Sequence, residues 1–351
     1  MPETFRTLAD LLAHGHDDVI DVRSPAEFAE DHIPGAINLP ALSNEERARV
    51  GTIYRQIAPF EARKTGAALV ARNVARHLET DLADRAGGWR PLVYCWRGGQ
   101  RSGSVATILR AVGWRADTIS GGYQTYRRLV HAMLYDTPLP HRVILLDGYT
   151  GTAKTDLLHR LADLGVQMLD LEGLAGHRGS ILGGDPSDQP SQKSFESALA
   201  CRLARLDPAR PVVLEAESSK IGERIIPPSL WAIMKAAPRI IVSAPLDARA
   251  AYLVEAYADV IARQDDLTNR LQVLRRHRGG AVVDRWLERL TAGDHEGLAR
   301  ALMQDHYDPS YAKSRAARAH PVLAQVAAPG LTPVDRDALA ARIAETVRSE
   351  G

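Results

Sequence analysis

A short apolar segment that leads into a glycine- and arginine-rich loop constrains the fold of this chain more than any other feature. Residues 91–94 predict a buried strand that ends at Cys95, and a helical pattern follows over residues 105–112. The connecting loop holds Arg97, Gly98, Gly99, Arg101 and Ser102. A strand–loop–helix turn of this kind directs backbone N–H groups and the positive end of a helix dipole into one centre. The segment therefore predicts an α/β domain with an anion site beside an activated thiol.

Cys95 has a simpler interpretation as a small core residue before a turn, because free cysteines are often buried. The two arginines of the loop favour a reactive thiolate instead, since a neighbouring positive charge lowers the pKa of a thiol. We therefore predict three catalytic residues, which are Cys95, Arg97 and Arg101. The predicted phosphate-binding residues of this loop are Gly98, Gly99 and Ser102.

Motifs on both sides of the loop extend the pattern over about the first 130 residues. Residues 19–28 predict a strand and then a helix that is capped by Ser24, with Pro25 in its first position. Residues 32–40 predict another short strand, and Ile-Ser-Gly-Gly-Tyr follows the loop at residues 119–123. In this order, the four motifs resemble the rhodanese domain, whose members carry sulfur or selenium on a loop cysteine. The resemblance implies a domain built on a parallel sheet.

The length of the cysteine loop departs from the ordinary rhodanese pattern. Cys95 to Arg101 is Cys-x5-Arg, whereas rhodanese loops resemble Cys-x4-Arg. The longer loop makes a wider anion cradle, as in the related cysteine phosphatases of the cell cycle, so a phosphatase is one alternative. Those phosphatases usually have histidine before the cysteine, where this chain has Tyr94. A wider cradle also suits a donor that carries phosphate together with the chalcogen.

A second strand–loop–helix pattern follows a proline-rich joint at residues 135–140. Residues 142–147 predict a buried strand, and the next segment matches the phosphate-loop pattern G-x4-G-K-[ST], with Ala153 in place of the second glycine. Its predicted phosphate-binding residues are Gly148, Gly151, Lys154 and Thr155. A tight turn with an incidental lysine is the alternative. We expect a rhodanese-like domain over residues 1–135 and, over residues 136–351, an α/β domain of the phosphate-loop NTPase type with C-terminal helices.

Two further predicted strands end in acids, and polar loops lie between them. In a parallel α/β sheet the carboxyl ends of the strands line the ligand crevice, and polar loops there often carry function. The candidate residues of a second-domain site are Asp170, Glu172, His177, Arg178, Ser180, Gln192, Lys193, Glu215, Glu217 and Ser218. Glu215 has the position of a magnesium-orienting acid. Acids that are merely solvated at strand ends are the alternative.

Composition excludes some classes of protein. No apolar run approaches the ~18 residues that a membrane helix requires, and two cysteines cannot form a disulfide framework. We therefore expect a cytoplasmic protein in which Cys201 is a core residue. The net charge is only +1, but just six of the 44 basic residues are lysine.

Arginine suits phosphates and base edges, so the basic end of a long amphipathic stretch at residues 246–278 is a candidate RNA contact. Its residues are Arg275, Arg276 and Arg278. A solvated helix face is the alternative explanation of this charge run.

With these segments in place, nearly the whole chain resembles the bacterial tRNA 2-selenouridine synthases, which join a rhodanese domain to a phosphate-loop domain. The matching segments are the cysteine loop with Trp96, Leu-Glu-Gly and His-Arg-Gly-Ser within 171–180, Gln-Pro-Ser-Gln-Lys at 189–193, Glu-x-Glu-Ser at 215–218 and His-Tyr-Asp-Pro-Ser-Tyr at 306–311. The family pattern has glycine where this chain has Ala153.

The resemblance implies a transferase that replaces sulfur by selenium in the wobble 2-thiouridine of tRNA. Geranyl diphosphate first alkylates the sulfur, and selenophosphate then supplies selenium while the geranyl thiol leaves. The phosphate loop would hold geranyl diphosphate, and the Cys95 loop would receive selenophosphate. The implied partners are tRNA, with Arg275, Arg276 and Arg278 as candidate contacts, and the enzyme that supplies selenophosphate. We expect no tightly bound cofactor, with Mg²⁺ as an optional companion ion, no metal-ligating residues and no membrane association.

Three other functions fit parts of the pattern. A cysteine phosphatase would use the first loop alone, and a small-molecule sulfurtransferase would not need the second domain. An ATP-dependent kinase with a regulatory rhodanese module would not need Cys95. The sequence leaves open whether the second loop binds ATP.

Overall fold

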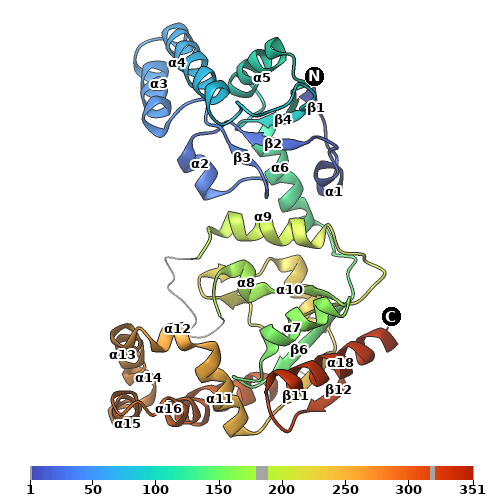
Figure 1. Ribbon diagram of the computed structural model, residues 1–351, viewed down its shortest axis with the longest axis vertical. Coiled ribbons are helices and arrows are strands. Elements are labelled where there is room, and N and C mark those ends of the chain that lie inside the picture. Colours follow the sequence, from blue (N-terminus) through green and yellow to red (C-terminus); the bar gives the residue numbers. More distant parts are fainter. Residues whose placement is uncertain (1, 179–188, 317–320, 351) are drawn as a thin grey trace. The chain divides into compact units, whose positions relative to one another are not determined.

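The structure is a computed structural model that describes residues 2–178, 189–316 and 321–350, with side chains up to residue 312 in the second of these ranges. The chain forms two compact units (Figure 1). The first comprises Met1–Pro138 and Pro190–Arg205, and the second comprises Leu139–Gln189 and Leu206–Gly351. Each unit is built on a five-stranded parallel sheet with helices around it, which confirms the predicted fold class.

The sheet of the first unit has the strand order β1-β5-β4-β2-β3. Its strands are β1 (Pro2–Glu3), β2 (Asp18–Asp21), β3 (Ile37–Asn38), β4 (Pro91–Tyr94) and β5 (Asp117–Ile119). The helices are α1 (Leu8–Leu12), α2 (Pro25–Glu30), α3 (Asn44–Gln56), α4 (Pro59–Glu79), α5 (Gln100–Val112), α6 (Gly122–His131), the π-helical turn Ala132–Asp136 and α9 (Gln192–Leu203). The predicted cap is confirmed, because α2 follows Ser24 with Pro25 in its first position.

The core of the first unit lies between the central strands and the helices α4 and α5. Ile20 of β2 and Val93 of β4 are fully buried against Leu69 and Leu109 of these helices. The predicted 105–112 helix begins earlier, at Gln100, so Arg101 and Ser102 belong to its first turn. The cysteine loop therefore spans only the few residues between the end of β4 and the start of α5.

Helix α9 belongs to the first unit although its sequence lies within the expected second domain. The boundary expected after residue 135 is close to the division at Pro138, but residues 190–205 return to the first unit. Phe195 and Leu199 of α9 are fully buried, and its Ser197 Oγ donates to Asp31 Oδ2 over 3.0 Å. Cys201 is buried too, as predicted, beside the Tyr126 hydroxyl. The contacts of Ser197 with Asp31 and of Cys201 with Tyr126, and not chain continuity, place α9 in the first unit.

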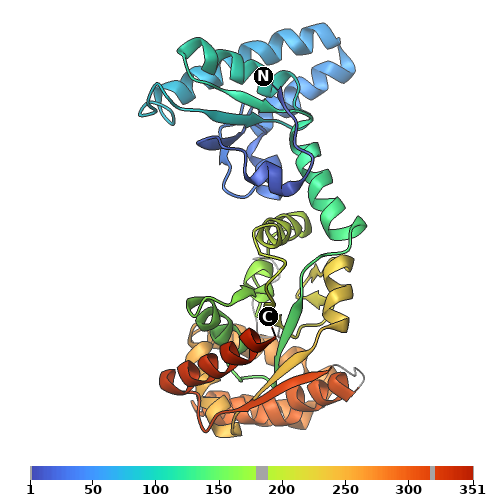
Figure 2. The same ribbon diagram turned by 90° about the vertical axis from the view of Figure 1, so that its right-hand side faces the viewer.

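The sheet of the second unit has the order β12-β11-β6-β8-β7. Its strands are β6 (Val143–Gly148), β7 (Gln167–Leu169), β8 (Val212–Glu215), β11 (Arg239–Ser243) and β12 (Val322–Ala327), and a short antiparallel pair is formed by β9 (Lys220–Ile221) and β10 (Arg224–Ile225). Figure 2 shows α7 (Lys154–Asp163) and α18 (Pro333–Ser349) on one face of this sheet and α10 (Pro228–Ala236) on the other.

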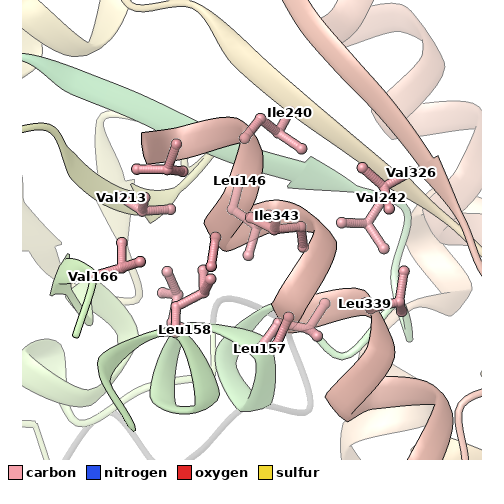
Figure 3. Close-up of a cluster of buried hydrophobic side chains, with 14 of the residues drawn as sticks. Leu146, Leu157, Leu158, Val166, Val213, Ile240, Val242, Val326, Leu339 and Ile343 are labelled. Atoms are coloured by element: carbon pink, nitrogen blue, oxygen red, sulfur yellow. The ribbon is translucent and has the colours of Figure 1, made fainter. Parts of the chain in front are cut away.

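The main core of the second unit lies under α7 and α18 (Figure 3). Leu157 and Leu158 of α7 and Ile343 of α18 are fully buried against strand residues such as Val213 and Val242. Because the strands are covered on both faces, they consist of nearly continuous apolar runs, as parallel strands usually do. This core fixes the carboxyl end of β6 and the start of α7, between which the phosphate loop lies.

Shorter helices form the rest of the second unit. They are α8 (Leu171–Ala175), α11 (Leu246–Ala256), α12 (Ala258–Ile261), α13 (Gln264–Val273), α14 (Arg275–Arg278), α15 (Gly280–Thr291), α16 (His295–Leu302), the π-helical turn Met303–Tyr307 and α17 (Asp308–Ala316). The amphipathic stretch predicted over residues 246–278 is helical, but turns divide it into four helices, of which α12 and α13 contribute to the cluster around Leu271 and Trp286. No helix of the described residues is long and apolar enough to cross a membrane.

Candidate functional site

The Cys95 loop is held against the start of α6 by close backbone packing. Gly98 has a φ of +63°, and a Cβ there would lie 2.4 Å from the carbonyl oxygen of Ile119. A Cβ on Gly122 would lie 2.2 Å from the carbonyl oxygen of Cys95, and the amide of Tyr123 donates to that oxygen over 2.8 Å. The Ile-Ser-Gly-Gly-Tyr motif thus exists because two backbones meet where no side chain fits.

The environment of Cys95 favours its thiolate. Ser102 Oγ donates to Cys95 Sγ over 3.3 Å, at the start of α5. Burial alone would raise the pKa of this thiol, but hydrogen bonds from Ser102 and Gly99 and the charge of Arg101 outweigh it and lower the pKa below its ordinary value of 9.0. These contacts support the prediction of an activated thiol at Cys95.

The two loop arginines have different surroundings. Arg101 Nη1 donates to Glu27 Oε2 over 2.9 Å, and Arg47 Nε from the start of α3 lies 3.0 Å from the same oxygen. Burial would raise the pKa of Glu27, but these arginines hold it below its usual range. Arg97 is exposed. Arg101 thus bridges the loop to α2 and α3, while Arg97 extends from the rim of the loop.

A buried polar network lies next to the loop, and no motif of the sequence predicted a function for it. Arg23 pairs with Asp21, and its guanidinium lies 4.0 Å from the ring centroid of Tyr123. The Tyr123 hydroxyl donates to Asp31 Oδ2 over 2.7 Å, where Ser197 also donates. The other oxygen of Asp31 has no partner among the described residues, and burial raises the pKa of this carboxyl. The Asp-x-Arg spacing at the end of β2 is the one sequence signal that points to this network.

The thiols of the two cysteines should ionise at different pH values. Burial raises the pKa of Cys201 to about 11, whereas the pKa of Cys95 lies below 9.0. Only thiolates react with iodoacetamide, so the alkylation rate of Cys95 should reach half of its plateau at a lower pH than that of Cys201. Peptide mass spectrometry over pH 6–11 would measure both profiles in one sample, with Cys201 as the internal reference. Coincident profiles would show that the loop does not activate its thiol.

The phosphate loop of the second unit contains a strained residue. Ala153 has a φ of 59° and is the one non-glycine residue with positive φ in the described part of the chain. This left-handed conformation costs an L-residue roughly 1–2 kcal/mol, which explains why glycine suits the position. Lys154 follows directly, and its Nζ donates to the carbonyl of Gly148 over 3.2 Å. The loop therefore keeps its geometry with Ala153 present.

Arg249 braces the phosphate loop from α11. Its guanidinium donates to the carbonyl of Thr150 over 3.1 Å and forms two hydrogen bonds with the carboxylate of Asp308. Asp308 belongs to the His-Tyr-Asp-Pro-Ser-Tyr segment, and Tyr311 of the same segment lies with its ring centroid 5.7 Å from Lys154 Nζ. The segment matched by resemblance thus contacts the phosphate loop, partly through an arginine that sequence reasoning missed.

The predicted acids lie at different depths. Thr155 Oγ1 donates to Glu172 Oε2 over 3.2 Å, and Glu172 shares a hydrogen bond with Glu217. Burial and the neighbouring Glu172 raise the pKa of Glu217 to about 8. Glu215 is fully buried, accepts from the amide of Leu171, and has a pKa raised well above its usual range by burial. Glu217 thus holds Glu172 by a hydrogen bond, while Glu215 is bonded to the backbone of Leu171.

A cavity of about 610 Å³ opens at the phosphate loop. Its lining includes the predicted residues Gly151, Lys154, Thr155, Asp170, Glu172, His177 and Arg178. It also includes Arg263, Arg270, Tyr252 and Tyr257, which the sequence analysis missed. The seven-residue spacing of the two arginines, from the residue that precedes α13 to the last turn of that helix, was the available signal, because it corresponds to about two helical turns.

Other predicted residues lie elsewhere. Glu215, Glu217 and Ser218 do not line this cavity, and Ser180 is outside the described residues. Gln192 and Lys193 belong to α9 in the first unit, where Lys193 pairs with Glu30 over 2.6 Å, so their assignment to the second domain needs correction. The reason is that Ser191 caps a helix whose Glu196 and Ser197 bind Arg127 and Asp31 of the first unit.

Most arginines of the basic segment at α14 bind other residues of the second unit. Arg275 pairs with Asp284, and Arg278 donates to His306 Nδ1 over 2.8 Å and to Ser310 Oγ over 3.0 Å. Arg276 is exposed. Two of these three candidate RNA contacts therefore hold the C-terminal helices together, and their side chains would have to exchange partners to meet a phosphate.

Known proteins resemble the chain over both units. The family model for the tRNA 2-selenouridine synthase AAA domain matches residues 141–329, and that for the rhodanese-like domain matches residues 4–129. The tRNA 2-selenouridine synthase of Chromohalobacter salexigens is 35% identical over 339 residues, which cover 87% of this chain and 90% of that protein. That of Hahella chejuensis is 34% identical and covers 84% of each. Among solved structures, the N-terminal domain of a Clostridium difficile 630 protein described as ATP/GTP binding is 35% identical, covering 37% of this chain and 98% of that chain with a TM-score of 0.32.

Proposed function

Because the chain belongs to the tRNA 2-selenouridine synthase family, we propose that it works in two transfer steps. The first step geranylates the sulfur of wobble 2-thiouridine with geranyl diphosphate, and the second replaces that sulfur with selenium from selenophosphate. The second unit binds geranyl diphosphate, and the Cys95 loop of the first unit receives selenophosphate. The reaction takes place in the cytoplasm, with tRNA and a selenophosphate-supplying enzyme as partners.

An apolar cavity beside the phosphate-loop cavity is the observation that best supports the geranylation step. Nine of its thirteen lining residues are aliphatic or methionine, contributed mainly by α11, α12 and α16. The two cavities share Thr150, Leu253 and Tyr257 in their linings. Val260 and Tyr307 line both cavities too. A ligand that spans both needs an anionic end and an apolar tail, as geranyl diphosphate has. The apolar cavity has a volume of about 70 Å³, so its side chains must move apart to admit a whole ten-carbon tail. ATP has no aliphatic chain to match this aliphatic lining, so the arrangement supports the prenyl donor over the kinase alternative.

The phosphate loop supports the chemistry of geranyl transfer. The sulfur of 2-thiouridine attacks C1 of the geranyl chain, the C–O bond breaks, and diphosphate leaves with the electron pair. Lys154 stabilises the charge that develops on the leaving group. Thr155 Oγ1 and Glu172 Oε2 lie 3.2 Å apart and are oxygen donors of the kind that Mg²⁺ prefers, so these residues would hold a companion ion. When bound, Mg²⁺ would neutralise part of the diphosphate charge.

The Cys95 loop supports the second step. Selenium adds to C2 of the modified uridine, the C–S bond breaks, and the geranyl thiol leaves with a proton. Water takes up the phosphoryl group of selenophosphate, so that phosphate is the second product. The N–H groups of the loop and Arg97 bind the phosphoryl group, while the Cys95 thiolate acts as nucleophile on its phosphorus. The P–Se bond breaks, selenide leaves with the electron pair to attack C2, and water then hydrolyses the phosphorylated cysteine.

Nucleoside mass spectrometry tests the two steps directly. The purified chain is incubated with tRNA that carries 2-thiouridine, first with geranyl diphosphate and then with selenophosphate. We expect the geranylated nucleoside after the first addition and 2-selenouridine after the second. Consumption of ATP with a phosphorylated product, or phosphate release from an aryl phosphate without tRNA modification, would favour a kinase or a phosphatase instead.

The apolar cavity can be tested through Leu253, a half-buried residue of α11 that lines both cavities. Leu253→Gln should raise the KM for geranyl diphosphate about tenfold, because burying a leucine-sized apolar contact contributes roughly 1.5–3 kcal/mol. Inhibition by inorganic pyrophosphate, which lacks the tail, should stay unchanged. The matched control is Leu246→Gln at the start of the same helix, where the leucine is also partly buried but lines neither cavity. Equal weakening of pyrophosphate and geranyl diphosphate would contradict a tail site here.

A further inference from the structure

The hairpin of α3 and α4 carries an exposed apolar tip that the core of the first unit does not use. Helix α3 buries none of its residues. Tyr54, Ile57 and Phe60, at the turn between the two helices, are 59%, 71% and 64% exposed. They fall within seven residues of sequence, although only ten large apolar side chains are exposed in the whole described part of the chain. Such a concentration on one turn marks an interaction surface and not scattered surface residues.

The same tip is basic. Residues 54–64 contain three cations, Arg55, Arg63 and Lys64, against the single acid Glu61, which gives a net charge of +2. The complete chain has a net charge of only +1. Lys64 pairs with Glu61, whereas no ion pair to another described residue involves Arg49, Arg55 or Arg63, all of which are exposed. Positive charge is thus gathered around the exposed aromatic rings.

The base of the hairpin is fixed to the cysteine loop. Arg47 in the first turn of α3 and Arg101 of the loop bind the same oxygen of Glu27. Asn73 of α4 donates to Glu46 Oε2 over 2.6 Å and to the carbonyl of Ala41 over 3.1 Å, which ties both helices to the body of the unit. Figure 1 shows α3 and α4 side by side. At 1.5 Å per residue, the thirteen-residue α3 places the tip about 20 Å from this base.

We propose that the tip of the α3–α4 hairpin (Tyr54, Arg55, Ile57, Phe60 and Arg63) is a contact surface for the substrate RNA. This inference rests on the proposed function. Tyr54 and Phe60 stack on unpaired bases, and Arg55 and Arg63 bind phosphates. A rigid arm anchored at the cysteine loop holds the RNA while its wobble base reaches Cys95.

Charge and area favour RNA over a protein partner. The net charge of +2 on residues 54–64 complements a phosphate backbone, and arginine with aromatic rings is the usual combination for single-stranded RNA. Three apolar side chains on one turn cover far less than the ~1,000 Å² that a specific protein interface requires. A second copy of this chain would also bring a second charge of +2 against the first.

Binding of an anticodon stem-loop that contains 2-thiouridine tests the proposal with the full chain. Arg55→Glu combined with Arg63→Glu should lower the slope of log K against log salt by about 1.4, at roughly 0.7 for each contact to single-stranded phosphate. Tyr54→Ala combined with Phe60→Ala should weaken binding about fivefold or more with little change in slope, because stacking is largely independent of salt. The control is Arg76→Glu, an exposed arginine in the last turn of the same helix α4, which should bind as the wild type does.

The outcomes separate this inference from the proposed function. If the wild-type chain does not bind the RNA even at low salt, the proposed function fails. If the wild type binds and both double variants bind equally well with an unchanged slope, only the hairpin surface is wrong. A change of molar mass in light scattering at unchanged RNA affinity would identify the tip as a self-association surface and would also overturn the proposal. Melting curves verify that each variant is folded.

Discussion

Replacing Cys95 with serine should abolish formation of 2-selenouridine and leave geranylation of the same tRNA intact. The hydroxyl of serine stays protonated at neutral pH, whereas the surroundings of Cys95 lower the pKa of its thiol and favour the thiolate. The substitution keeps the size of the side chain and the hydrogen-bonding position opposite Ser102, so the loop should keep its geometry. Nucleoside mass spectrometry on tRNA that carries 2-thiouridine measures both products in one reaction.

Cys201→Ser is the matched control for this experiment. Cys201 is equally buried and belongs to the same unit, but burial raises the pKa of its thiol to about 11. We expect the control to retain selenation. Wild-type yields of 2-selenouridine from the Cys95 variant would remove the thiol from the mechanism and leave the loop as an anion site only.

Lys154→Ala should slow geranyl transfer about 100-fold, because loss of a preorganised charge at a developing anion costs roughly 3 kcal/mol. Selenation of tRNA that already carries the geranyl group should proceed at the wild-type rate, since that step is assigned to the Cys95 loop. Single-turnover assays with each substrate measure the two steps separately. Lys220→Ala, which removes an exposed lysine of the same unit, is the control.

An equal loss in both steps would contradict the division of labour. In that case Lys154 either has a structural role through its bond to the carbonyl of Gly148, or a single site serves both reactions. Thermal unfolding of the variant distinguishes the two explanations, because a structural role predicts a lower midpoint and a shared site predicts an unchanged one.

Local chemistry could be predicted from the sequence, and tertiary packing could not. The residues of the two anion loops are contiguous, so strand, turn and helix signals locate Cys95 and Lys154 directly. The apolar cavity is different, because α11, α12 and α16 contribute to it from distant segments. A hydrophobic pattern predicts which residues are buried but not which other segment buries them. The four helices within residues 246–278 therefore appeared as one amphipathic stretch.

Arginine shows the same limit at single residues. Arg275 and Arg278 lie in a basic segment of the kind that contacts RNA, but in the structure they bind Asp284 and His306 of the same unit. Arg249, without any motif, holds the phosphate loop because folding brings Asp308 and the carbonyl of Thr150 to its two sides. The partner of a long cationic side chain depends on the tertiary fold, so sequence alone predicts its chemistry and not its use.

The return of α9 to the first unit has a consequence for protein synthesis. Ser197 and Glu196 of α9 bind Asp31 and Arg127, so the buried polar groups of the first unit stay incomplete until residue 205 has left the ribosome. Translation adds roughly 5–20 residues per second, so a nascent chain that has reached Pro138 waits on the order of seconds for its last helix. During that interval the surface that later receives Ser197 and Cys201 is open to chaperones. The rhodanese-like unit therefore cannot finish folding before part of the second unit has been translated. The rate of that translation sets the time at which the first unit is complete.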